Sequence, residues 1–338
     1  MVLPRMKALV TVGDGTFRLQ DISVPALASG QILVKVVAVA QNPTDWKTLL
    51  LHTRAGNILG SDFAGTVIKL GTDVPADVRE LGERVAGFVH GGISPNGAFA
   101  EYVAVDSALV IAIPDTMTFE HAAQLGIACF TVCQSLYQCL RLPTPLHPST
   151  SSEPVDILIW SGTSATGQYA VQFAKLAGLR VISTASPKRL DLVRSLGADE
   201  VYDYADSKTA RRISAAGGRS VEIRHGLYQR GDDAKSGEHV AGEGGRHHRD
   251  PPSVRKLPER CDIEFPFPFP RNLEHYENAK TYAKLISRVL SLGTVKPVPV
   301  RLYPHGLASV QEGLEDMKDG KIHAEKITYR IADTPGLG

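Results

Sequence analysis

The sequence predicts an α/β protein built from a β-rich, barrel-like N-terminal part and a doubly wound parallel sheet. Residues 31–106 alternate between apolar and polar side chains with Gly-rich breaks, which is typical of short, half-buried strands. From Val155 the chain changes to continuous apolar runs followed by amphipathic stretches, as in strand–helix–strand units around a parallel sheet. A third observation limits the prediction, because residues 207–262 are too polar to continue that sheet.

The composition is that of a globular protein without a dominant charge. The 338 residues are 43% hydrophobic and 22% charged, and the formal net charge is +1. No strong field attracts nucleic acid or an anionic membrane, and no segment has the ~20 apolar residues of a membrane span. The N-terminus lacks a signal-peptide pattern, so we expect a cytoplasmic protein with neither kind of partner.

The expected N-terminal elements follow from four alternating segments and one apolar stretch. The strands are QILVKVVAVA, DFAGTVIKLG, GERVAGFVHG and GAFAEYVAVD, and residues 119–140 form the expected helical stretch. Residues 142–154 are rich in Pro and Ser and predict a surface loop. The four cysteines lack metal-ligand spacing, so we expect core thiols at Cys129, Cys133, Cys139 and Cys261.

The second part begins with a strand, a tight turn and a helix. VDILIWSG predicts a buried strand, QYAVQFAKLAG an amphipathic helix closed by Gly178, and LRVISTAS a second strand. A helix over PKRLDLVRSLGA and a strand at EVYDY follow. This order is half of a doubly wound nucleotide-binding fold.

The turn SGTSATGQ, Ser161–Gln168, joins the first of these strands to its helix. Small residues let a backbone approach a pyrophosphate, and the helix N-terminus offers N–H donors. The turn is not a strict GxGxxG, so an ordinary strand-to-helix turn stays open as the alternative.

The second strand ends in TASPKR, Thr184–Arg189, where NAD-binding folds usually carry an acid for the ribose 2′-hydroxyl. No acid is present, whereas Ser186, Lys188 and Arg189 offer the hydroxyl and cations that a 2′-phosphate requires. The sequence therefore favours NADP(H) over NAD; the alternative is a solvated first helical turn.

Several motifs together resemble the medium-chain dehydrogenase/reductase superfamily. They are NPTDWK (42–47), GSDFAGTV (60–67), GERVAGF (82–88), GAFAEYV (97–103), the SGTSATG turn and the ending EGLEDMKDGKIHAEKITYRI (312–331). Within it, the chain is most similar to the fungal trans-acting enoyl reductases of polyketide biosynthesis. The resemblance implies a GroES-like catalytic domain over residues 1–125, completed by 296–338, and a Rossmann-type NADP-binding domain over 126–295.

The departures from the zinc-dependent members are specific. Those enzymes place a Cys ligand where this chain has Pro43 and Thr44, a His-Glu pair where it has Ser61 and Asp62, and a four-Cys structural loop that is missing here. We therefore expect no metal site. The resemblance implies zinc-independent hydride transfer from NADPH to the β-carbon of an enoyl thioester, followed by protonation of the α-carbon.

The resemblance also implies site residues. The nicotinamide-ribose side would be lined by Thr44, Asp45, Trp46 and Lys47. The pyrophosphate would be held by Thr163, Ser164, Ala165 and Thr166. The 2′-phosphate would be surrounded by Ser186, Pro187, Lys188, Arg189 and Tyr204. The C-terminal return would close over the cofactor with Ile322 and His323, and the substrate pocket would be bordered by Thr131, Val132 and Gln138. No catalytic residue is assigned, since solvent competes with Lys47 and Tyr102 as proton donor.

Residues 207–262 contain nine large apolar residues against twelve Lys and Arg, eight acids, four His and eight Gly. Such a composition predicts disorder, and it fits neither a metal site at His247 and His248 nor a nucleic-acid arm. A reading frame shifted by one nucleotide permits GVTIVTLL for GRHHRDPP and AMDCIS for RHGLYQ, both strand-like. We therefore hypothesise a frame error that begins before Arg224 and ends before Phe265.

Three functions remain open. The first is an NADPH-dependent enoyl reductase, expected to be a monomer that acts on a small or carrier-bound enoyl substrate of a polyketide synthase. The second is a quinone or alkenal reductase of the same superfamily. The third is an inactive relative with a damaged cofactor domain.

Overall fold

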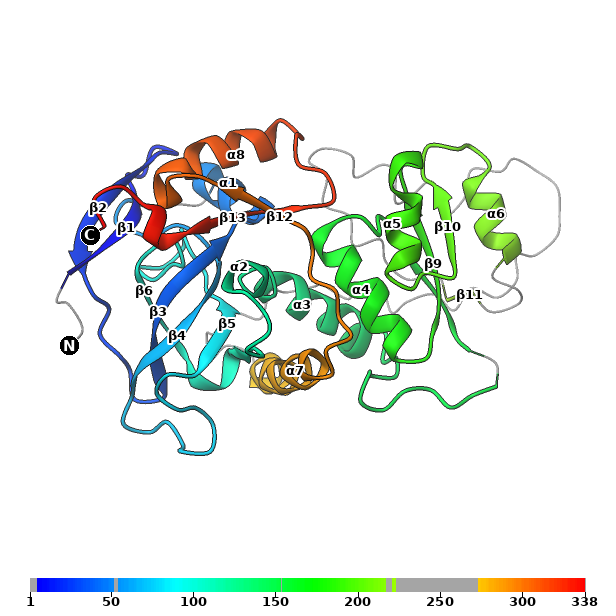
Figure 1. Cartoon of the computed structure of the whole chain (residues 1–338), viewed down its shortest axis with the longest axis horizontal. Helices are drawn as coiled ribbons and strands as arrows, with labels where there is room; N and C mark the ends of the chain where they lie inside the picture. The colour runs from blue at the N-terminus through cyan, green and yellow to red at the C-terminus, as the bar shows by residue number, and fades with distance from the viewer. Residues whose placement is uncertain (1–4, 52–53, 153, 217–220, 223–272, 338) are drawn as a thin grey trace. The chain divides into compact units, whose positions relative to one another are not determined.

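The computed structural model describes residues 5–51, 54–152, 154–216, 221–222 and 273–337 (Figure 1). The chain divides into two compact units, Met1–Phe130 with Glu264–Gly338 and Thr131–Ile263. We call them the mixed-sheet unit and the parallel-sheet unit and describe each by itself. The predicted α/β class is confirmed, while the predicted domain boundaries remain a prediction.

The mixed-sheet unit is built around a seven-stranded sheet in the described residues, in the order β12-β13-β3-β4-β5-β7 with β6 paired to β3. Its strands are β3 (Gln31–Ala40), β4 (Asp62–Leu70), β5 (Arg84–Phe88), β6 (Tyr102–Asp106), β7 (Ile111–Ala112), β12 (Val300–Tyr303) and β13 (Lys326–Arg330). A ribbon of β1 (Arg5–Thr11) and β2 (Phe17–Ser23) completes the unit. The C-terminal strand β13 thus pairs with β3, so segments far apart in the sequence share one sheet.

The helices of this unit are α1 (Pro43–Leu51), α2 (Phe119–Ala122), α3 (Gly126–Cys133), α7 (Leu273–Ser291) and α8 (Val310–Lys318). Short 3₁₀ turns lie at Ser107–Leu109, Gly306–Ser309 and Ile331–Asp333. Helix α8 packs against α1 (Figure 1). Helix α7 packs against β7.

The core of the unit explains why the alternating segments became strands. Side chains at alternate positions of β3, such as Ile32, Val34 and Val36, are buried together with Phe63 and Tyr329. Each buried side chain of that size contributes about 1.5–3 kcal/mol relative to exposure. The predicted strands at 31–40, 62–71, 82–91 and 97–106 correspond to β3, β4, β5 and β6.

The parallel-sheet unit contains β8 (Asp156–Ile159), β9 (Arg180–Ala185), β10 (Glu200–Asp203) and β11 (Val221–Glu222), all parallel, in the order β10-β9-β8-β11. Its helices are α4 (Ala165–Leu176), α5 (Leu190–Ser195) and α6 (Thr209–Ala216), with a 3₁₀ turn at Pro187–Arg189. This is the predicted order of strands and helices, because continuous apolar runs such as Ile157–Ile159 are buried.

The helical stretch predicted over residues 119–140 is not continuous. It is divided into α2, α3 and a π-helical segment, Gln134–Cys139. The break has a steric cause at Gly126, where an added Cβ would lie 2.4 Å from Asp62 Oδ1 and 2.6 Å from the Gly87 carbonyl oxygen. The chain therefore restarts its helix where the backbone passes against the neighbouring strands.

The segment 207–262, for which the composition predicts disorder, contains regular secondary structure in its first part. Helix α6 and strand β11 lie within it, because Ile213 of α6 is buried against Leu158 and Ile182. Residues 223–263, which contain most of the proposed frame error, lie outside the described residues, as does Cys261.

The expected core thiols are confirmed at two positions, because Cys129 and Cys133 are buried and free. The expectation is wrong for Cys139, which is disulfide-bonded. In the described part of the chain, no helix has the length and apolar character needed to cross a membrane.

Candidate cofactor and substrate site

The predicted phosphate turn is a tight connection from β8 to α4. Ser164 is the N-cap of α4, and its Oγ accepts the Gly167 N–H at 3.0 Å. Ser161 has a φ of +63°. At Gly162 an added Cβ would lie 2.3 Å from Ser183 Oγ, so this position requires glycine. Thr163, Ser164, Ala165 and Thr166 are brought together, partly exposed, at the N-terminus of a 12-residue helix.

This turn fits the pyrophosphate of a dinucleotide. A helix N-terminus presents backbone N–H donors and the positive end of the helix dipole. The first helical turn carries no acidic side chain, and Thr163 and Thr166 add hydroxyl groups. The turn follows a buried parallel strand, which is where open α/β sheets bind ligands.

The residues predicted for the 2′-phosphate meet beside β9 and β10. Ser186 is the N-cap of the 3₁₀ turn that begins at Pro187, and Lys188 and Arg189 are exposed on that turn. Tyr204 directly follows β10, donates its N–H to the Ala185 carbonyl oxygen at 3.3 Å and is 47% exposed. Two cations and an exposed phenol therefore surround the carboxyl end of β9.

A cluster of buried polar side chains lies in the mixed-sheet unit, and we call it the Asp62 cluster: Asn42, Asp45, Ser61, Asp62 and Lys326. Lys326 Nζ lies 2.8 Å from both Asp62 Oδ2 and Asn42 Oδ1. Asp62 also accepts the Asn42 side-chain amide at 2.8 Å and the Ile127 N–H at 2.7 Å. One carboxylate thus joins β4, β13, the segment before α1 and the first turn of α3.

The first turn of α1 is fixed to this cluster through Asp45. Asp45 accepts the Asn42 N–H at 2.7 Å and the Ser61 hydroxyl at 2.8 Å, and it is 1% exposed. Burial raises the pKa of Asp45 to about 7, and the neighbouring Asp62 acts in the same direction. Both hydrogen-bond donors to Asp45 therefore belong to the mixed-sheet unit.

The other residues predicted on the nicotinamide-ribose side have different surroundings. Trp46 is half-buried against the core, and Lys47 Nζ lies 5.6 Å from the centre of its ring. Thr44 Oγ1 lies 3.4 Å from Thr48 Oγ1, one helical turn away. Thr44, Trp46 and Lys47 are all partly exposed, so each can reach a ligand.

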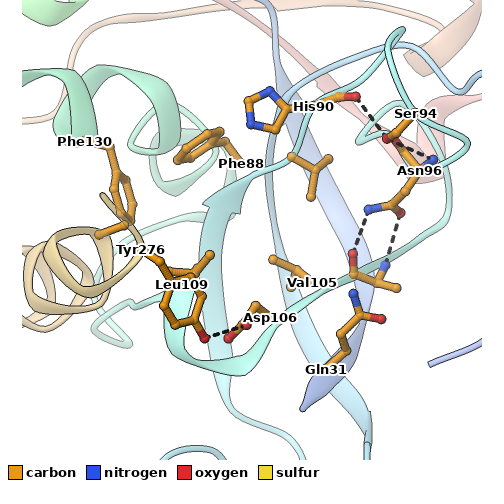
Figure 2. A pocket seen from close by; sticks show the side chains of 13 residues that line it. Gln31, Phe88, His90, Ser94, Asn96, Val105, Asp106, Leu109, Phe130 and Tyr276 are labelled. Atoms are coloured by element: carbon orange, nitrogen blue, oxygen red, sulfur yellow. Dashed lines mark hydrogen bonds between the residues drawn. The ribbon is translucent and has the colours of Figure 1, made fainter. Parts of the chain in front are cut away.

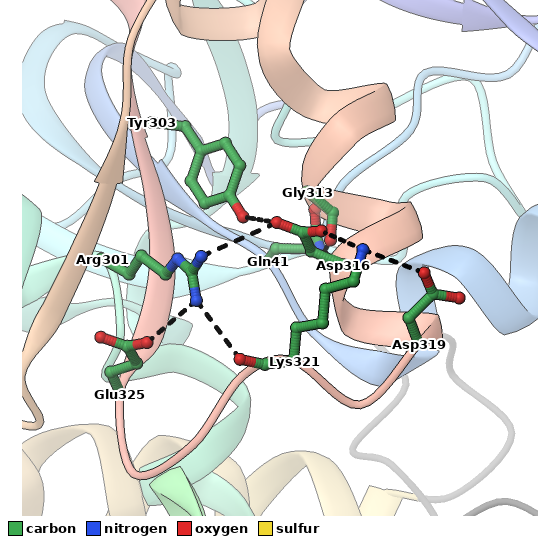
Figure 3. Close-up of polar contacts among 8 residues, drawn as sticks. All are labelled: Gln41, Arg301, Tyr303, Gly313, Asp316, Asp319, Lys321 and Glu325. Carbon is green, nitrogen blue, oxygen red and sulfur yellow. Dashed lines mark hydrogen bonds and ion pairs between the residues drawn. The ribbon is translucent and has the colours of Figure 1, made fainter.

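Ile322 and His323 lie between α8 and β13. A network of charged side chains around Arg301 holds this turn of the C-terminal return in place (Figure 3). Arg301 of β12 donates to the Lys321 carbonyl oxygen at 3.3 Å and to Glu325 Oε1 at 3.2 Å, so it is hydrogen-bonded to both sides of the turn. Lys321 Nζ lies 3.0 Å from Asp316 Oδ1, and Asp316 also accepts the Tyr303 hydroxyl. Ile322 is half-buried and His323 is exposed.

Beside the Asp62 cluster lies a cavity of about 310 Å³ (Figure 2). Phe88, Val89, Val105, Leu109 and Phe130 form much of its wall, and the polar side chains Gln31, His90, Ser94, Asn96, Asp106 and Tyr276 complete it with Ala104 and Ala279. The rings of Phe88 and Phe130 meet edge to face, with centroids 5.2 Å apart. Tyr276 of α7 donates its hydroxyl to Asp106 Oδ2 at 2.8 Å.

Comparison with known proteins decides the family. Residues 28–115 match the alcohol dehydrogenase GroES-like domain, and residues 165–224 match the family described as zinc-binding dehydrogenase. The chain is 34% identical over 342 residues to trans-enoyl reductase ACTTS2 of Alternaria alternata, an alignment that covers 96% of this chain and 98% of that relative. The chain belongs to the trans-enoyl reductases of the medium-chain dehydrogenase/reductase superfamily.

Solved structures share the fold of this trans-enoyl reductase chain. CurK enoyl reductase matches with a TM-score of 0.71 at 18% identity, over 96% of this chain and 99% of that one. Mycobacterial Rv1454c, solved in complex with NADPH, matches with a TM-score of 0.68 at 22% identity and the same coverage. The chain is an oxidoreductase that uses a nicotinamide cofactor, and the residues of its phosphate turn fit that group.

The donor groups of this trans-enoyl reductase do not fit the catalytic zinc that one matching family's description mentions. Asp62 is bonded to an ammonium group, Ser61 donates to Asp45, and burial raises the pKa of the nearby Cys129 thiol. Zinc requires deprotonated thiolate, neutral imidazole or available carboxylate ligands. Within the described ranges, no group of three His, Cys, Asp or Glu residues could hold a metal ion.

The residues predicted for the substrate pocket lie along one helical segment. Thr131 is partly exposed on α3, Val132 is fully buried beside it, and Gln138 lies in the π-helical segment. The cavity is lined by Phe130, one residue before Thr131. These assignments, like those of the cofactor residues, remain predictions.

Sequence reasoning missed the Asp62 cluster and the Arg301 network. Ser61 and Asp62 were singled out only as positions without zinc ligands. A signal was present in β13, since Lys326 begins the strand KITYR directly before the apolar residues Ile327 and Tyr329. Its partner lies 264 positions away, so the sequence alone does not pair them.

Proposed function

We propose that this chain is an NADPH-dependent, zinc-independent enoyl reductase that reduces the activated C=C bond of an enoyl thioester in polyketide biosynthesis. The likeness to a trans-enoyl reductase over 96% of the chain carries the proposal. The phosphate turn, the cations after β9 and the donor groups of the Asp62 cluster, which do not fit zinc, support it.

The residues of the chain would bind and orient the cofactor and shield the reacting atoms. A nicotinamide supplies a hydride to the β-carbon of the activated C=C bond when it is bound. Thr163, Ser164 and Thr166 would hold the pyrophosphate at the N-terminus of α4. The Asp62 cluster keeps the first turn of α1 in place, so that Thr44 and Lys47 keep a fixed position. The proton for the α-carbon would come from solvent, since no described side chain has an assigned role as its donor.

The preference for NADPH over NADH rests on the end of β9. Ser186, Lys188 and Arg189 supply a hydroxyl and two exposed cations, and no acid follows the strand to accept a 2′-hydroxyl. Charge-assisted bonds to a phosphate are roughly twice as strong as neutral ones, so these cations favour the 2′-phosphorylated cofactor.

We further propose that the substrate is presented by a polyketide synthase and that the chain works as a monomer. The names of the relatives support a role in trans, since trans-enoyl reductase ACTTS2 is aligned over 98% of its length. Faster reduction of a carrier-bound enoyl chain than of the matching free thioester would support a synthase partner.

The experiment that tests the proposal follows NADPH oxidation with two substrates. Crotonyl N-acetylcysteamine thioester and a small quinone are compared at equal concentrations, each with NADPH and with NADH. The proposal expects reduction of the thioester with NADPH. Faster reduction of the quinone would identify a quinone reductase, and NADPH binding without turnover of either would identify an inactive relative.

A further inference from the structure

Several polar side chains in the wall of the cavity beside β5 are already bonded to the backbone of the protein. Gln31 Oε1 accepts the Ala28 N–H at 3.0 Å, and Asn96 bonds to both backbone groups of Ala104 at 2.7 and 3.4 Å. Ser94 donates to backbone oxygens. A polar occupant would find these groups already used and would lose its own hydrogen bonds to water.

The charge in the wall of the cavity also favours an uncharged ligand. Asp106 accepts the Tyr276 hydroxyl at 2.8 Å through one oxygen and the Ala108 N–H at 2.9 Å through the other. Burial and this carboxylate raise the pKa of Tyr276, which therefore stays a neutral donor. An anionic ligand would meet a carboxylate in the wall, whereas an uncharged hydrocarbon gains from contact with Phe88, Val105, Leu109 and Phe130.

The cavity adjoins the residues that fix α1. Phe88 pairs directly with Asp62 across β4 and β5, and the Val89 N–H donates to the Ser61 carbonyl oxygen at 2.9 Å. The ring of Phe88 therefore stands on the same face of the sheet as the Asp62 carboxylate. The wall of the cavity is therefore continuous with the strand pair that carries Ser61 and Asp62.

We propose that this cavity binds the hydrocarbon end of the acyl chain of the substrate, so that Phe88, Phe130, Leu109 and Ala279 set the preferred chain length. The inference rests on the proposed function and extends it to a substrate class, long apolar enoyl chains. A volume of about 310 Å³ is at the lower end of small-molecule sites, which matches one such chain.

The test fills the cavity from α7. Ala279 is 2% exposed and lines the cavity, so Ala279→Phe places a ring inside it. Thr281→Phe adds the same ring on the exposed side of the same helix and serves as the matched control. Leu109→Ala enlarges the cavity, and its effect has the opposite sign. Melting temperatures of all three variants show that they are folded.

Binding and turnover are measured separately. Binding of the saturated decanoyl N-acetylcysteamine thioester is followed by calorimetry, and kcat/KM is measured for crotonyl and trans-2-decenoyl thioesters with NADPH. Ala279→Phe should weaken decanoyl binding and decenoyl turnover about tenfold or more, since several methylene contacts are lost, and it should lower crotonyl turnover by a smaller factor. Leu109→Ala should raise the ratio of decenoyl to crotonyl turnover, and Thr281→Phe should resemble the unaltered chain.

Two results would overturn the inference. One is decanoyl binding by Ala279→Phe that equals binding by the unaltered chain, and the other is no decanoyl binding by the unaltered chain. If decanoyl binding responds to Ala279→Phe but no thioester is reduced, the proposed function fails and the cavity assignment stands.

Discussion

At the scale of single residues, Asp45 is a carboxyl group that is almost completely removed from water. It accepts two hydrogen bonds, yet burial dominates and raises its pKa to about 7. The folded state therefore holds a proton at pH values where the unfolded chain, with an ordinary carboxyl pKa, has released it. The free energy of unfolding should fall as the pH rises from about 4 to about 7 and then level off.

Asp45→Asn removes this titration and keeps the shape of the side chain. The amide can accept the Asn42 N–H and donate to Ser61, so the variant should lose the fall in stability between pH 5 and pH 8, on the order of 1–4 kcal/mol. Urea unfolding at the two pH values measures it. Asp191→Asn, at a carboxylate that is 97% exposed, is the control, and an unchanged pH slope in Asp45→Asn would contradict the assignment.

Lys188 and Arg189 are the residues on which the proposed cofactor preference depends. The double substitution of both by Ala should raise the KM for NADPH about tenfold or more and leave the KM for NADH within about twofold, because only NADPH carries the 2′-phosphate. Steady-state kinetics with both cofactors measure the change. Arg194→Ala removes an exposed cation from the adjacent helix α5 and should alter neither value; equal losses for both cofactors would refute the role.

At the scale of elements, the Lys326–Asp62 ion pair joins the C-terminal strand to the rest of the mixed sheet. Both side chains are at most 5% exposed, so removal of one partner leaves a buried charge without its counter-charge. Lys326→Met should cost about 3–5 kcal/mol of unfolding free energy. Asp62→Asn alone leaves the ammonium group unpaired and should also destabilise the fold.

The double variant Lys326→Met with Asp62→Asn measures the interaction between the two side chains apart from their interactions with other groups. It should be destabilised by clearly less than the sum of the single variants, with a coupling of about 1–3 kcal/mol. Denaturant unfolding of the three variants completes the cycle. Strict additivity would mean that the two charges do not stabilise each other. Lys280→Met, at a partly exposed ion pair on α7, should cost about 1 kcal/mol or less.

Elements were predictable where local pattern decides them. The runs at 155–162 and 179–186 became β8 and β9, and Ser164 caps α4 as the phosphate turn required. The division of residues 119–140 was not predictable, because it depends on the close approach of Gly126 to β4 and β5. The Asp62 cluster depends in the same way on partners far apart in the sequence, which no local window contains.

At the scale of the whole molecule, the decisive question is whether the chain as written binds its cofactor. A ligand that binds only the folded state at about 100 times its Kd adds about 2.7 kcal/mol to the free energy of unfolding. Saturating NADPH should therefore raise the melting temperature by a few degrees, and NADH by less at equal concentration. Scanning fluorimetry measures both, and the absence of any shift would favour an inactive relative.

The hypothesis of a frame error is tested on the nucleic acid. Sequencing of the coding DNA and of the transcript across the codons for residues 205–265 should reveal a shifted frame with strand-like sequence. A continuous frame that encodes only the written residues would exclude it.

The order of the parallel strands has a consequence for where the cofactor enters. The chain adds β9 and β10 on one side of β8 and then places β11 on its other side. Because later strands lie on both sides of β8, a crevice opens at its carboxyl end, which is the topological switch point of such sheets. The phosphate turn begins at that point, whereas β11 pairs with Asp156 and Ile157 at the amino end of β8. The crevice at the phosphate turn is therefore where we expect the cofactor to enter.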